Sequence, residues 1–103
     1  MNSGSRGPEQ PTTQMTPTEL RDQPSPDGLS PVLAALWHDN RGDWERAHEL
    51  AQSEDSSQGA HVHAYLHRKE GDEFNARYWY SRANAPFPDV SLDEEWEQLA
   101  ATL

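Results

Sequence analysis

The sequence predicts an all-α fold with two antiparallel helical hairpins and a C-terminal capping helix. The main support is an internal repeat: residues 35–47 read ALWHDNRGDWERA and residues 64–76 read AYLHRKEGDEFNA, an offset of 29 residues. A period of this size is typical of stacked helical hairpins. The identical pairs are Ala35/Ala64, His38/His67, Gly42/Gly71, Asp43/Asp72 and Ala47/Ala76. Regularly spaced helix start and stop signals favour the same fold class.

The first predicted helix covers residues 31–41. Ser30 is a favourable N-cap, and a proline suits the first turn because its missing N–H has no partner there in any case. Gly42 ends the helix, since glycine adopts the left-handed conformation that closes a helix. Asp43 can then accept hydrogen bonds from free N–H groups, so the Gly-Asp pair predicts a compact joint to a second helix over residues 44–53.

The second hairpin repeats this design. A Ser-rich turn at residues 54–58 leads to a third predicted helix over residues 59–70. Gly71 and Asp72 form the second Gly-Asp joint, which predicts a fourth helix over residues 73–84.

The last predicted helix covers residues 92–103. It follows a turn that contains two prolines, and Ser91 with Glu94 forms a capping-box pattern. Apolar side chains recur through it at helical spacing, at Leu92, Trp96, Leu99 and Leu103. We expect this helix to cover the hairpin stack as a lid.

Residues 1–28 are predicted to be a disordered tail rich in Pro, Ser and Thr. Their only sizeable apolar side chains are Met1, Met15 and Leu20, which bury too little surface to offset the entropy of ordering the segment. The helical domain is therefore expected to cover residues 29–103.

The second hairpin resembles the tetratricopeptide-repeat family. In that family the second helix of a unit carries a small, an aromatic and another small residue, followed by a proline beyond its end. The matching residues here are Ala76, Tyr80, Ala83 and Pro88, and the earlier unit matches at Gly42, Asp43, Trp44 and Ala47.

The resemblance covers about residues 31–103 and has three departures. The period is 29 residues rather than about 34. Glu73 stands where the family usually has an aromatic residue, and the first unit lacks a closing proline. The resemblance implies a tetratricopeptide-like stack whose concave face binds other proteins.

Charge and composition argue against several classes of partner. The formal net charge is -10, and residues 29–103 contain six basic against fourteen acidic side chains. Such a surface repels phosphate groups, so we expect binding neither to nucleic acid nor to anionic membranes. No apolar run approaches the roughly 20 residues of a membrane span. The absence of cysteine agrees with a reducing compartment, and we expect a cytoplasmic protein.

The expected function is that of a non-enzymatic protein-interaction or assembly module without a cofactor. No phosphate-binding loop, nucleophile elbow or cysteine nucleophile is present. Since about three repeats are usually needed for stability, the last helix, part of the segment before Ser30 or a second copy of the chain should cover the ends of the stack. The partner is expected to be a protein or peptide, and a homodimer is one such arrangement.

Five residues are candidates for the recognition surface: Trp37, His38, His67, Arg77 and Trp79. The run Tyr78, Trp79, Tyr80 spans about 200 degrees of a helix, so it cannot be wholly inside. Tyr80 should face its own hairpin, and Tyr78 or Trp79 should face a neighbour or water.

Histidine offers an alternative from another functional class. His63 and His67 lie one turn apart on a predicted helix and could grip a divalent metal, with Asp39 or Glu70 completing the site. In this alternative the chain is a small metal-dependent protein or enzyme.

A structural role for the same histidines is the competing interpretation. Ala64 stands where the zinc-protease pattern has its glutamate, and His67 has a repeat counterpart in His38. The sequence therefore favours a histidine that packs between the helices of a hairpin.

Overall fold

The computed structural model describes residues 16–103, so the first part of the predicted tail lies outside the described residues. Within that range, 69% of the residues are helical and no strand is present, which confirms the all-α class. The helices are α1 (Pro17–Asp22), α2 (Pro31–Asn40), α3 (Trp44–Ser53), α4 (Ser57–Glu70), α5 (Glu73–Arg82) and α6 (Leu92–Thr102). The five predicted helices are all present, with ends within two residues of the predicted ones.

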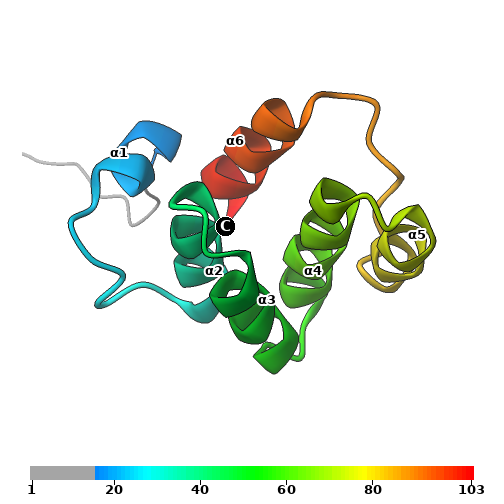
Figure 1. Cartoon of the computed structure of the whole chain (residues 1–103), viewed down its shortest axis with the longest axis horizontal. Coiled ribbons are helices and arrows are strands. Elements are labelled where there is room, and N and C mark those ends of the chain that lie inside the picture. Colours follow the sequence, from blue (N-terminus) through cyan, green and yellow to red (C-terminus); the bar gives the residue numbers. More distant parts are fainter. Residues whose placement is uncertain (1–15) are drawn as a thin grey trace, which may run out of the picture.

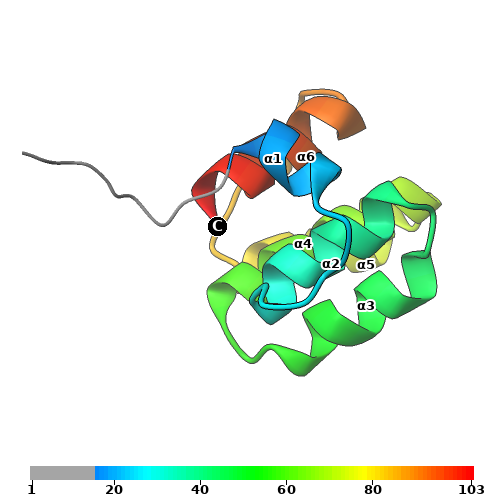
Figure 2. The same ribbon diagram turned by 90° about the vertical axis from the view of Figure 1, so that its left-hand side faces the viewer.

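The helices form two layers. Helices α2, α3, α4 and α5 follow one another across the molecule in Figure 1, and α1 and α6 lie together over one side of that row in Figure 2. Helix α4 is the centre of the packing, because it contacts α2, α3, α5 and α6. No helix within residues 16–103 combines the length and apolar character that crossing a lipid bilayer requires.

Most of the buried apolar side chains belong to one core. It takes residues from α1, α2, α3, α4 and α6, and its most deeply buried large members include Leu20, Leu36, Val62 and Leu66. A smaller cluster of Ala64, Ala76 and Tyr80 holds α5 against α4. The larger core thus joins the two layers, while α5 depends on contacts with α4.

The two Gly-Asp joints have the same backbone geometry. Gly42 and Gly71 adopt left-handed conformations with φ of +84° and +89°. In both joints the N–H of the following aspartate donates to the carbonyl five residues earlier, at 2.9 Å. The 29-residue repeat is therefore a repeat of local structure as well as of sequence.

Each joint aspartate also caps the helix that follows. The Asp43 carboxylate accepts the backbone N–H of Arg46 at 3.1 Å, and the Asp72 carboxylate accepts that of Asn75 at 3.2 Å. These bonds satisfy N–H groups that have no partner inside the helix. They explain why α3 and α5 begin where the sequence predicts.

Helix α5 ends two residues earlier than predicted. Asn84 adopts a left-handed conformation with φ of +58°, and the N–H of Ala85 donates to the Tyr80 carbonyl at 3.0 Å. Asparagine is the residue that tolerates this conformation best after glycine. It closes α5 in the way that glycine closes α2 and α4.

The packed part of the chain begins before residue 29, where the sequence placed the start of the domain. Thr16 and Glu19 form a capping box at the start of α1, and Leu20 of that helix is fully buried against the core. Further along, the Gln23 carbonyl accepts the Trp37 indole N–H at 2.9 Å and a guanidinium N–H of Arg41 at 2.8 Å. One leucine and a few carbonyl contacts thus attach a polar, Pro-rich segment that composition alone assigned to the tail.

Asp39 of α2 is buried and bound to α4. Its carboxylate accepts the Tyr65 hydroxyl at 2.8 Å and the Lys69 ammonium at 2.9 Å. Burial, followed by the charge of Asp39 and the hydrogen bond to it, raises the pKa of Tyr65. The tyrosine therefore stays protonated and donates to the carboxylate.

Glu95 of α6 is buried in the same manner. It accepts the Tyr80 hydroxyl at 2.5 Å and a guanidinium N–H of Arg68 at 2.8 Å, and His61 Nε2 lies 3.8 Å away. Burial alone raises the pKa of Glu95, but the bonds from His61, Tyr80 and Arg68 and the charge of Arg68 together lower it. Arg68 also donates to the Val90 carbonyl, which fixes the chain ahead of α6.

We predict that Glu95→Gln lowers the free energy of unfolding by roughly 2 to 4 kcal/mol at pH 7, because it leaves the half-buried Arg68 without its counter-charge. Since the folded pKa of Glu95 lies below its ordinary 4.5, its stabilising contribution is present above pH 4.5 and is lost as the pH falls through the folded pKa. Urea unfolding of both proteins between pH 3 and pH 7 measures this effect. The exposed Glu97→Gln is the matched control, and equal losses for both variants would contradict the prediction.

We also predict that Gly59→Ala destabilises the protein. Alanine normally stabilises a helix by about 1 kcal/mol relative to glycine. Here a Cβ on Gly59 would lie 2.2 Å from the backbone carbonyl oxygen of Glu54, so the turn before α4 would have to shift. Thermal unfolding should show a lower midpoint for Gly59→Ala and no loss for the adjacent exposed Gln58→Ala; a raised midpoint for Gly59→Ala would refute the clash.

Candidate functional site

Three histidines meet between α3 and α4. His48 comes from α3, and His63 and His67 come from successive turns of α4; one potential ligand atom from each lies within 4.8 Å of the others. The ring centroids are 4.5 Å apart for His48 and His63, 5.2 Å for His48 and His67, and 4.8 Å for His63 and His67. We call these three residues the histidine cluster.

Two tryptophans enclose the histidine cluster. Trp44 stacks on His48 with 4.9 Å between ring centroids, and Trp79 stacks on His63 at 4.0 Å. The indole N–H of Trp44 donates to the Leu66 carbonyl at 2.8 Å, which holds that ring in place. The imidazole planes of His48 and His63 are therefore fixed by flat aromatic surfaces.

Two members of the histidine cluster, His48 and His63, favour the neutral imidazole. Burial, followed by the charges of His48 and His67, lowers the pKa of His63 to about 4. Burial and the charge of His67 lower the pKa of His48 as well, against smaller opposite effects of Glu70 and Glu49. A neutral imidazole has one ring nitrogen with a free lone pair, which is the form that binds a metal.

The two carboxylates that the sequence suggested as additional metal ligands lie in different places, and only one is beside the histidine cluster. Glu70 lies beside the histidine cluster, with its Oε1 2.6 Å from Nδ1 of His67. Asp39 is instead bound to Tyr65 and Lys69, so it does not serve the cluster. His48 was missed because it lies 15 residues before His63, and only the packing of α3 on α4 brings the two together.

The other candidate recognition residues lie in two separate places. Trp37 is half-buried, bonded to the Gln23 carbonyl and covered by the Arg41 guanidinium at 3.9 Å from its ring, with His38 edge-on beside it. Arg77 lies on α5, paired with Glu73 and 4.4 Å from the Phe87 ring centroid. Trp79 and His67 both contact His63, so those two candidates do come together.

The aromatic run on α5 is arranged as the helical geometry requires. Tyr80 is buried in its hairpin and Trp79 is half-buried against the histidine cluster. Tyr78 is 51% exposed and Phe74, one turn earlier, is 84% exposed. Sequence reasoning did not single out Phe74, although its spacing from Tyr78 placed both on one helix face.

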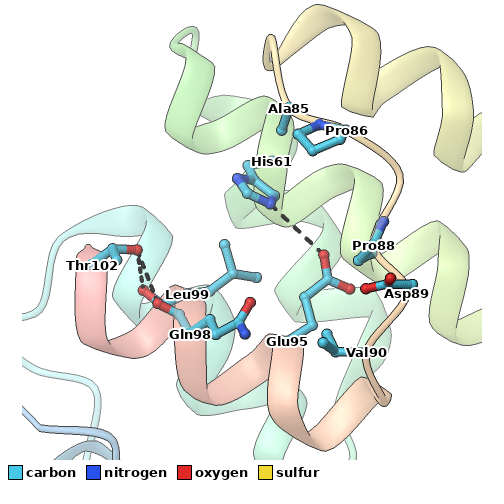
Figure 3. A pocket seen from close by; sticks show the side chains of 10 residues that line it. All are labelled: His61, Ala85, Pro86, Pro88, Asp89, Val90, Glu95, Gln98, Leu99 and Thr102. Carbon is cyan, nitrogen blue, oxygen red and sulfur yellow. Dashed lines mark hydrogen bonds and ion pairs between the residues drawn. The ribbon is translucent and has the colours of Figure 1, made fainter.

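A separate hollow of about 400 Å³ lies between α4, α6 and the segment that joins α5 to α6 (Figure 3). Its lining residues are His61, Ala85, Pro86, Pro88, Asp89, Val90, Glu95, Gln98, Leu99 and Thr102. Figure 3 shows Glu95 directed toward His61, across the hollow. Because the Glu95 carboxylate is already bound by Tyr80 and Arg68, it has little capacity left for a ligand.

Comparison with known proteins assigned no family. The chain matches no protein-family model, no curated protein and no solved structure. The site must therefore be interpreted from its own geometry and chemistry.

We predict that His63 of the metal-free protein titrates near pH 4, because burial disfavours its charged form. Folded protein should therefore lose stability as the pH falls from about 6.5 toward 4, since only the unfolded chain readily takes up this proton. Trp79→Ala should raise the pKa of His63 toward 6.5 by exposing it. NMR titration of the histidine rings measures this shift, with Phe74→Ala as the control; an unchanged pKa in Trp79→Ala would contradict the role of burial.

Proposed function

We propose that this chain is a non-enzymatic protein-interaction or assembly module built on a tetratricopeptide-like helical stack. The observation that carries the proposal is the outer face of α5, where Phe74 and Tyr78 are 84% and 51% exposed. We call these two residues the α5 aromatic pair. Large exposed aromatic side chains on adjacent turns favour a binding surface over a solvated one.

The position of α5 supports this proposal. Helix α5 packs closely against α4 and is otherwise joined to α6 by the hydrogen bond from Tyr80 to Glu95; it lies at one edge of the row in Figure 1. Terminal helices of repeat stacks usually present a polar outer face, which keeps the stack soluble. An end helix with two exposed aromatic rings instead favours a further helix packed on it.

The chemistry beside the aromatic pair favours a protein partner. The Arg82 guanidinium lies 5.9 Å from the Tyr78 ring centroid and donates to the Tyr78 hydroxyl at 3.3 Å. Tyrosine and arginine are enriched among the residues that contribute most to protein–protein binding. An amphipathic helix, supplied by another protein or by a second copy of the chain, would bury the pair and satisfy the guanidinium.

Two further features support the proposal. The Gly-Asp joints with equal geometry are compatible with repeated hairpins of the tetratricopeptide type. The absence of cysteine keeps the cytoplasm as the proposed location.

The test replaces the aromatic pair by Phe74→Ser and Tyr78→Ser in the full chain. Because both side chains are exposed, the double variant should keep its thermal midpoint within a few degrees of wild type. Sedimentation velocity from about 1 to 200 μM should show concentration-dependent self-association of the wild type that weakens at least tenfold in the double variant.

If the wild-type chain stays monomeric, wild type and the double variant are compared for binding to a different protein. Cross-linking mass spectrometry should then identify a protein cross-linked through α5 by the wild type and lost by the double variant. Glu45→Ser with Glu49→Ser on α3 is the control. A partner retained equally by wild type and the double variant would refute the α5 surface, as would the absence of any partner for either chain.

A further inference from the structure

We propose that His48, His63 and His67 together bind one divalent transition-metal ion of the zinc class. The site is distinct from the α5 aromatic pair and does not depend on the proposed interaction function. Sequence reasoning offered only His63 and His67, whereas the structure adds a third imidazole from a different helix.

The three donor atoms already converge. Zinc binds histidine nitrogens at about 2.0 to 2.1 Å, which places tetrahedral ligand atoms roughly 3.4 Å from one another. The potential ligand atoms of the histidine cluster lie within 4.8 Å of one another, so closure needs movements on the order of 1 Å. His48 and His67 are only partly buried, which leaves room for movements of this size.

His63 supplies an independent reason to expect a ligand. It is 4% exposed, and no residue within 16–103 forms a hydrogen bond with its ring nitrogens. Buried polar groups are nearly always bonded, and leaving one unbonded costs free energy. A metal ion at the centre of the histidine cluster would satisfy the lone pair of the buried imidazole.

The surroundings of the cluster resemble the supporting contacts of metal sites. Glu70 Oε1 lies 2.6 Å from Nδ1 of His67, which leaves Nε2 of that ring for an ion. A carboxylate bound to the far nitrogen orients a ligand histidine and increases its basicity. Trp44 and Trp79 restrict rotation of the other two rings and screen them from water.

The donor set selects the kind of ion. Three imidazole nitrogens suit Zn²⁺, Co²⁺, Ni²⁺ and Cu²⁺, whereas Mg²⁺ and Ca²⁺ prefer oxygen ligands. Three protein ligands leave a coordination position for water or an exchangeable ligand. His63 also lines a cavity of about 380 Å³ whose charged side chains are Glu54, Asp55 and Arg82, so an ion can approach the cluster from this side.

The experiment titrates Zn²⁺ into the chelator-treated full chain by calorimetry and records visible absorption with Co²⁺. Wild type should bind one equivalent with micromolar or tighter affinity, and Co²⁺ should give the absorption bands of a tetrahedral nitrogen site. His48→Gln and His67→Gln should each weaken binding by at least about tenfold. His38→Gln, at the repeat counterpart of His67, should bind as wild type does.

Three further measurements distinguish loss of the metal site from loss of folding and test where the ion binds. Circular dichroism establishes whether each variant is folded, and Cu²⁺ quenching of tryptophan fluorescence reports an ion beside Trp44 and Trp79. The Phe74→Ser and Tyr78→Ser double variant should bind metal like wild type, so failure of either proposal leaves the other intact.

Three outcomes would overturn the metal proposal. One is no saturable binding of Zn²⁺ or Co²⁺ by wild type at about 100 μM free ion. Another is wild-type affinity in folded His48→Gln. The third is loss of binding in Glu70→Gln while His48→Gln retains it, which would place the ion at the neighbouring group His67, Glu70 and Asp72 instead.

Discussion

The arrangement of the helices depends on two buried carboxylates that bind neighbouring faces of α4. Asp39 brings α2 to Tyr65 and Lys69, and Glu95 brings α6 to Arg68. A carboxylate removed from water is tolerated only when hydrogen bonds and an opposite charge replace its hydration. The pairings therefore set where α2 and α6 can pack, because another arrangement would leave a charge buried alone.

The positions of the histidine cluster and of the α5 aromatic pair both follow from the central position of α4. With α2 and α6 bound by the carboxylates, its remaining side faces α3 and α5, where His63 and His67 meet His48 and Trp79. Helix α5, in contrast, packs closely only against α4 and meets α6 through the hydrogen bond from Tyr80 to Glu95, which leaves the α5 aromatic pair uncovered. The donor atoms lie between α3 and α4, whereas the exposed aromatic pair lies on α5. A metal ion at the histidine cluster would join α3 to α4, the helix against which α5 packs.

Local features could be predicted from the sequence because their causes lie within a few residues. Ser30, Asp43 and Asp72 cap the helices that follow them, and Gly42 and Gly71 close the helices before them. Each depends on a backbone conformation or an N–H group next to it in the chain. The all-α class and most helix ends therefore followed from pattern alone; the exceptions are the end of α5 at Asn84, the start of α4, which Ser56 caps two residues earlier than predicted, and α1. Asparagine predicts a helix end less strongly than glycine does. Helix α1 is held in place by the burial of its single leucine, which depends on the core formed by the other helices.

The sequence by itself determined the existence and approximate bounds of α2 to α6, the repeated joints and the pairing of His63 with His67. Only the tertiary structure decided that His48 completes the histidine cluster, that Asp39 binds Lys69 instead of joining it, and that Glu95 is buried. These outcomes depend on contacts between residues 15 to 30 positions apart, such as Lys69 with Asp39 and Tyr80 with Glu95. The physical reason is that helical periodicity fixes which residues share a face, whereas the neighbour of that face depends on how all the helices bury their apolar surface together.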